Sequence, residues 1–106
     1  MVKRIPKLPD TLKVGAMVCS IEINNEWLKG AHAHGEIRSD ALEIKLNDER
    51  PLLQRQKTAL HEAIHAVSDV YCQGAELCEE QVTALAQGLL QAMHDNPEYT
   101  AFILAR

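Results

Sequence analysis

The hydrophobic period of the chain changes near Pro51, and this change constrains the fold more than any other feature. Before Pro51, apolar residues alternate with polar ones at a period near 2, which is typical of half-buried strands. After Pro51 they recur at three and four residues, which is typical of amphipathic helices. The length of 106 residues suits one domain, because domains commonly hold about 100 to 150 residues. The sequence therefore predicts a single α+β domain over residues 1–106.

The strands are expected between about residues 11 and 47, in a small, mostly antiparallel sheet. The clearest are Met17–Ile23, which stops at the turn-tolerant pair Asn24-Asn25, and Leu42–Leu46. Two weaker segments lie between them, at residues 26–29, ending at Gly30, and at residues 33–37. A hairpin through residues 38–41 pairs the last of these with Leu42–Leu46.

Three helices are expected, at about residues 51–73, 78–95 and 97–105. Pro51 suits the first helical position, and Gly74 is placed to end the first helix in a left-handed cap. The core stripe expected on the first helix is Leu60, Ala63, Ile64 and Val67. The inner face expected on the second helix is Val82, Leu85, Ala86, Leu89 and Met93.

Composition excludes several classes of protein. With 46% hydrophobic and 25% charged residues, the chain resembles an ordinary soluble globular protein. Its formal net charge of −4 argues against direct binding of nucleic acid or of an anionic membrane surface. Aromatic residues are 4% of the chain, which leaves too few rings for the base-stacking surface of a single-strand binder.

The charged N-terminal residues are not followed by the apolar run of a signal peptide, and no stretch approaches the roughly 20 apolar residues that span a bilayer. The three cysteines, Cys19, Cys72 and Cys78, are an odd number. An odd number does not fit a disulfide framework, so we expect free thiols and a cytoplasmic protein.

The first predicted helix contains the pattern His-Glu-x-x-His, in His61-Glu62-Ala63-Ile64-His65. Residues four apart in a helix lie about 40° apart around its axis, so both imidazoles can reach one ion. Zinc accepts two such nitrogens. Glu62 is rotated about 100° from His61, beside the ligands, where its carboxylate can take a proton from a metal-bound water. The alternative without a metal site is a pair of surface histidines on the helix.

A catalytic zinc commonly has three protein ligands, so a third is needed. Glu79 and Glu80 are the candidates, because they begin the next helix across a short loop. With Val82 at 0°, Glu79 falls at about 60° and Glu80 at about 160°, which favours Glu79. An irregular first turn would favour Glu80. The other acid complements the dipole of the helix N-terminus.

Four further residues are candidates for supporting roles. Asp69, four residues after His65, is placed to orient an imidazole, and Thr83, four after Glu79, is placed to do so from the second helix. The simple alternative for both is a surface position. His32 and His34 lie on one side of a predicted strand. They could act as metal ligands or as oxyanion donors, and the alternative is that they are surface histidines.

The chain resembles small zincin metallopeptidases of the gluzincin type, found in prophages and mobile elements and related to the ImmA/IrrE-like proteases. The resemblance runs from about His34 to Pro97, and the specific piece is Thr58–Ala66. The weaker pieces are residues 34–37, 42–46 and 79–86. The chain departs from the family at Thr83, where an Asn or Asp is common.

The resemblance implies a strand beside the cleft on which a peptide can pair, two His ligands, a Glu as general base and a Glu ligand on the following helix. In this sequence these are His61, His65, Glu62, and Glu79 or Glu80. It further implies one Zn²⁺ per chain and a peptide or protein substrate.

Two functions follow from these patterns. The first is a zinc-dependent metallopeptidase. The second is a non-catalytic or latent zinc-binding regulatory protein that keeps the fold and acts through a partner protein or as a dimer. Structural zinc sites close four protein ligands, whereas catalytic sites leave a position for water, so the coordination distinguishes the two functions.

Overall fold

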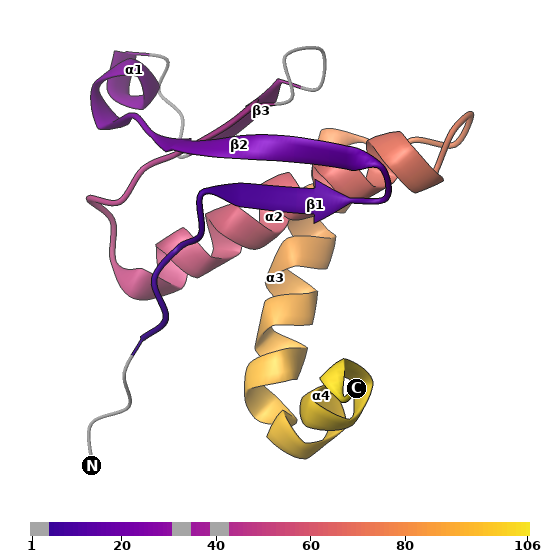
Figure 1. Cartoon of the computed structure of the whole chain (residues 1–106). Helices are drawn as coiled ribbons and strands as arrows, with labels where there is room; N and C mark the ends of the chain where they lie inside the picture. Colours follow the sequence, from indigo (N-terminus) through magenta and orange to yellow (C-terminus); the bar gives the residue numbers. More distant parts are fainter. Residues whose placement is uncertain (1–4, 31–34, 39–42) are drawn as a thin grey trace.

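The computed structural model describes residues 5–30, 35–38 and 43–106, and their fold is α+β. A four-stranded sheet is followed by three consecutive helices (Figure 1). The strands are β1 (Thr11–Val14), β2 (Met17–Ile23), β3 (Gly35–Arg38) and β4 (Glu43–Leu46). The helices are α1 (Asn25–Gly30), α2 (Leu52–Tyr71), α3 (Glu79–Asp95) and α4 (Pro97–Leu104).

The sheet is mixed, with the strand order β1-β2-β4-β3. The β1–β2 and β3–β4 pairs are antiparallel, and the central β2–β4 pair is parallel. Two of the three strand pairs are therefore antiparallel, as expected for most of the sheet, but the sheet is not antiparallel throughout. A parallel pair needs a crossover of about a dozen residues or more, and residues 24–42 between β2 and β4 supply that length. Alternating hydrophobicity reveals strands but not which strands become neighbours.

The short segment at residues 26–29, which the sequence grouped with the strands, is helical in α1. The side chain of Asn24 explains the difference, because its Oδ1 accepts a hydrogen bond from the backbone N–H of Trp27 at 3.2 Å. This bond satisfies one of the free N–H groups at the helix start. Leu28 is fully buried in the same turn and fixes α1 against the protein.

The core lies between the sheet and α2. Cys19, Ile44 and Leu46 are its buried centre, and Ala59 of α2 packs against them. The expected core stripe of α2 is partly wrong, since Val67 is exposed. The buried residues of α2 are Thr58, Glu62, Ala66 and Ser68. The buried positions of α2 therefore carry polar side chains as well as an apolar one.

The long helices agree with the expected ranges to within two residues at each end. Pro51 is the N-cap of α2 rather than its first residue, and α2 ends at Tyr71. Gly74 has a φ of +83°, the left-handed conformation expected after this helix. No helix in the described ranges is long and apolar enough to cross a membrane.

The buried face of the second long helix, α3, agrees only in part with the one expected. Val82, Ala86 and Leu90 are its buried residues, whereas Leu85 and Leu89 are exposed. Spaced four apart, the buried residues form one row along the helix, and Glu79 at its first position precedes that row. Beyond its contact with α2, α3 extends away from the sheet, and α4 lies at its far end (Figure 1).

Candidate metal centre

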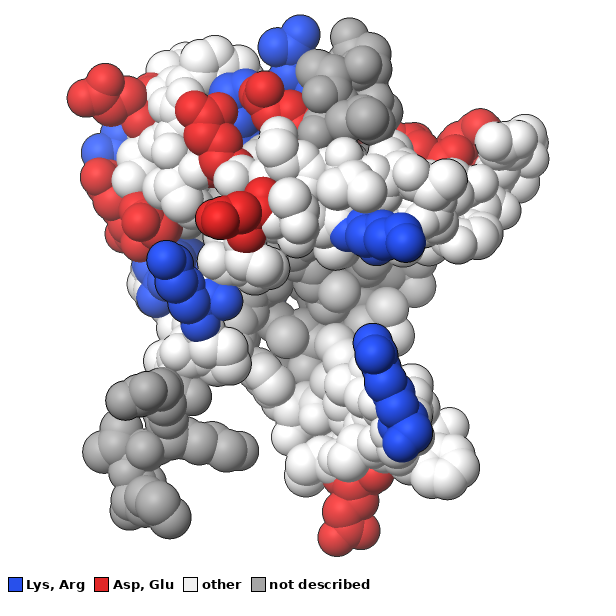
Figure 2. Space-filling model, viewed as in Figure 1, with Lys and Arg blue, Asp and Glu red and all other residues white. Residues whose placement is uncertain are grey.

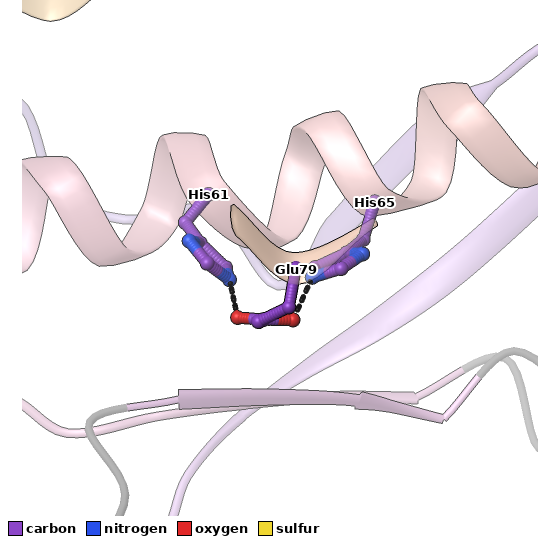
Figure 3. Close-up of side chains that lie close together, drawn as sticks. All are labelled: His61, His65 and Glu79. Carbon is purple, nitrogen blue, oxygen red and sulfur yellow. Dashed lines mark hydrogen bonds and ion pairs between the residues drawn. The ribbon is translucent and has the colours of Figure 1, made fainter. Parts of the chain in front are cut away.

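Two helices bring His61, His65 and Glu79 together. Nε2 of His61 lies 2.7 Å from Oε1 of Glu79, and Nε2 of His65 lies 2.8 Å from its Oε2. Figure 3 shows the two imidazoles pointing from α2 toward this one carboxylate. Their ring centroids are 4.9 Å apart, as expected for neighbours one helical turn apart. The His-Glu-x-x-His spacing thus places both Nε2 atoms on the same carboxylate.

The loop between α2 and α3 determines where Glu79 lies. The backbone N–H of Leu77 donates a hydrogen bond to Oγ of Ser68, a buried residue of α2, at 2.8 Å. Next to Leu77, the backbone N–H of Cys78 donates to Oε1 of Gln81 at 3.0 Å, one half of a capping box at the start of α3. These bonds hold the first turn of α3 against α2.

Glu80, the alternative third ligand, is not part of this group. Within the part of the chain that the structure describes, the residues able to share one metal ion here are His61, His65 and Glu79. Glu80 is exposed and does not line the cleft beside them. The first turn of α3 is regular, so the 100° between consecutive residues turns Glu80 away when Glu79 faces the histidines.

Glu62 is buried beside the histidines, with only 4% of its surface exposed. Its Oε1 lies 3.7 Å from Nε2 of His61, and its Oε2 is buried without a hydrogen-bond partner among the described residues. Burial, followed by the negative charges of Glu79 and Glu36, raises the pKa of Glu62 from 4.5 to about 7. An acid with a pKa near 7 can both take and give a proton at neutral pH.

A cleft of about 670 Å³ adjoins these side chains. Its walls are α2, the first turns of α3 and the edge strand β3, and both Asp69 and Thr83 line it. Gly35 allows β3 to approach α2 closely, because a Cβ there would lie 2.5 Å from Cγ2 of Thr58. The two other predicted candidates, His32 and His34, lie outside the described residues.

The donor set fits a divalent metal ion. Ligand atoms of His61, His65 and Glu79 lie within 4.8 Å of one another. A tetrahedral ion with bonds of about 2.0 to 2.1 Å would bring them to about 3.3 Å apart, a movement that side-chain rotation can supply. Two imidazoles and a carboxylate suit zinc, and also other transition metals. The orphaned Oε2 of Glu62 would accept a hydrogen bond from a water in the cleft.

The charged residues Lys57 and Glu36 also line the cleft, and neither had a predicted role at the site. The signal for Lys57 was its place four residues before His61, on the same side of the helix. Glu36 belongs to a segment that the resemblance includes, but alternation alone does not show which of its side chains face a cleft. The cysteines agree with expectation, since Cys19, Cys72 and Cys78 are all free.

No protein-family model, curated protein or solved structure matches this chain. The function must therefore be argued from the site itself.

Proposed function

We propose that this protein is a zinc-dependent metallopeptidase. The observation that carries the proposal is the convergence of His61, His65 and Glu79 beside the buried acid Glu62. A purely structural site has no use for an acid at that position. Within the described ranges the cluster offers three ligands, which leaves a fourth position for water or substrate, as in catalytic zinc sites.

The reaction is the hydrolysis of a peptide bond. Zinc held by His61, His65 and Glu79 would supply a Lewis acid that lowers the pKa of water and polarises the substrate carbonyl. Glu62 takes one proton from the attacking water, whose oxygen bonds to the carbonyl carbon. Glu62 then gives that proton to the leaving nitrogen as the carbon–nitrogen bond breaks. Its raised pKa suits both steps.

The substrate is a peptide or a flexible protein segment that lies along β3. β3 is the last strand in the order β1-β2-β4-β3, so one of its edges has no neighbouring strand among the described residues. Gly35, Glu36 and Ile37 of β3 line the cleft. An extended segment can add to such an edge through backbone hydrogen bonds, which brings a peptide carbonyl beside the metal site.

The three free cysteines suit a reducing compartment, and we place the protein in the cytoplasm of a prophage or mobile-element host.

The direct test is peptide cleavage by zinc-loaded wild-type protein and its Glu62→Gln variant, on a mixture of unstructured peptides read by mass spectrometry. We expect the variant to retain zinc and to cleave at least about 100-fold more slowly, because it loses general-base catalysis. Glu80→Gln is the control, with an unchanged rate. Equal cleavage by wild type and Glu62→Gln would contradict the proposal.

A second candidate is a latent zinc-binding regulatory protein, and α4 favours it. Tyr99, Phe102, Ile103 and Leu104 of this helix are 64% to 82% exposed. The surface over α3 and α4 is mostly uncharged in Figure 2. Apolar surface of this extent is typical of interfaces, and a partner protein or a second copy would cover it. Zinc binding without Glu62-dependent cleavage, together with self-association that Phe102→Glu abolishes, would favour this candidate.

A further inference from the structure

Four side chains of α2 line the cleft at four-residue intervals. They are Lys57, His61, His65 and Asp69. A rise of 1.5 Å per residue separates consecutive members by about 6 Å along the helix axis. The proposed metal site therefore has a positive charge on one side along α2 and a negative charge on the other. Among the described residues, Lys57 forms no ion pair that would neutralise it.

The edge strand β3 runs in the same direction as α2. At one end of the sheet, Gly35 begins β3 against Thr58, and its Cα partner is Leu46 at the end of β4. At the other end, Gly15, in the turn before β2, lies against Tyr71. The parallel strands β2 and β4 therefore run from the C-terminal end of α2 toward its N-terminal end. Because β3 is antiparallel to β4, it runs the opposite way, from Thr58 toward the histidines.

A peptide that joins β3 has a favoured direction. Antiparallel pairs outnumber parallel ones by roughly two- to threefold and are slightly more stable per residue. An antiparallel peptide runs against both β3 and α2, so residues after the scissile bond extend toward Lys57 and residues before it toward Asp69. Lys57 lies about 6 Å from His61 and about 12 Å from His65 along the axis. At about 3.4 Å per residue, this distance matches the second or third residue after the scissile bond.

Building on the proposed peptidase function, we propose that Lys57 selects substrates with a carboxylate two or three residues after the scissile bond. The ammonium group of Lys57 forms an ion pair with that carboxylate at the edge of the cleft. The carboxylate is either an acidic side chain within a longer chain or the C-terminus of a short peptide. A charge pair in a solvated cleft is worth about 1 kcal/mol at most, which is about a fivefold preference.

The test begins with the peptide mixture and cleavage-site mapping by mass spectrometry, for wild type, Lys57→Gln, Lys57→Glu and the control Lys13→Gln on β1. Wild type and Lys13→Gln should enrich Asp and Glu about fivefold at the second or third position after the cut. Lys57→Gln should lose this enrichment, and Lys57→Glu should replace it with Lys and Arg. Zinc content should be the same in all four proteins.

A binding measurement on the best substrate separates the two sources of the carboxylate. Zinc-loaded Glu62→Gln protein is titrated with labelled peptides that carry Glu or Gln at the selected position, each with a free or amidated C-terminus. If Lys57 binds an acidic side chain, the Glu peptides should bind about fivefold more tightly than the Gln peptides. If Lys57 binds the C-terminal carboxylate, the free-acid peptides should bind about fivefold more tightly than the amidated ones. The Lys57→Gln change in the same background should remove either difference.

Three results would overturn the inference. Glu62-dependent cleavage without acidic enrichment would refute the role of Lys57 and leave the peptidase function standing. Lys57-dependent enrichment before the cut would refute the antiparallel direction and with it the proposal. Absence of any Glu62-dependent cleavage in the mixture would refute the inference and the proposed function together.

Discussion

Nε2 of His65 and Oε2 of Glu79 lie 2.8 Å apart although fourteen positions separate the two residues in the chain. The hydrogen bond from the backbone N–H of Leu77 to Oγ of Ser68 positions the loop that joins them. The candidate metal centre therefore depends on Ser68, a residue outside the proposed ligand set.

Ser68→Ala removes that acceptor and leaves the N–H of Leu77 without its partner. We expect the free energy of unfolding to fall by about 1 to 3 kcal/mol, the cost of a lost buried hydrogen bond. Zinc affinity should fall as well, by roughly 10-fold, because Glu79 is less well held. Urea unfolding and zinc titration measure the two effects. A variant with lower stability and unchanged zinc affinity would show that the loop does not position Glu79.

Gly35→Ala tests the close approach of β3 to α2. The added Cβ would lie 2.5 Å from Cγ2 of Thr58 and 3.2 Å from the backbone oxygen of Lys45. Strand and helix must separate, so we expect a loss of about 1 to 3 kcal/mol in the free energy of unfolding. Gly88→Ala in α3 is the matched control, since nothing lies within 4 Å of its new Cβ. It should gain up to about 1 kcal/mol from helix propensity. Equal effects of the two substitutions would contradict the packing described.

The raised pKa of Glu62 makes the metal-free protein less stable as the pH rises. Below pH 4.5 both the folded and unfolded states carry the proton. Between 4.5 and about 7 the unfolded state loses it while the folded state keeps it, so the free energy of unfolding falls with pH. At about 1.4 kcal/mol per pKa unit, the loss approaches roughly 3 kcal/mol above pH 7.

Urea unfolding in the presence of a chelator, at pH 5 and pH 8, measures this loss. Glu62→Gln has no carboxyl group to titrate, so the difference between the two pH values should shrink by about that amount. The other titrating groups are shared by both proteins and cancel in the comparison. An identical pH dependence in wild type and variant would contradict the burial of this acid.

Local signals in the sequence predicted the long helices and the proximity of His61, His65 and Glu79. The His-Glu-x-x-His spacing fixes where His61 and His65 lie relative to each other, because both belong to one regular helix. The rotation from Val82 favoured Glu79 over Glu80, and the regular start of α3 supports that geometry. Gly74 has the expected left-handed backbone, although α2 ends earlier, at the C-cap Cys72.

Features that depend on distant contacts could not be predicted in the same way. The parallel pairing of β2 with β4 depends on where the crossover places β4. The alternation of apolar and polar residues in either strand does not indicate which strand becomes its neighbour. The exposure of Leu85 and Leu89 depends on where α3 leaves α2. The helical form of α1 depends on the side-chain bond from Asn24 and the burial of Leu28, which outweigh weak local preference.

We propose that His61, His65 and Glu79 hold one zinc ion. The most direct test of this proposal is zinc per chain by elemental analysis, together with zinc affinity, for wild type, Glu79→Gln and Glu80→Gln purified without a chelator or metal-binding tag. We predict about one zinc in wild type and in Glu80→Gln, and an affinity lower by on the order of 100-fold in Glu79→Gln. Wild type that takes up no zinc even when zinc is added, or equal zinc in all three proteins, would contradict the account.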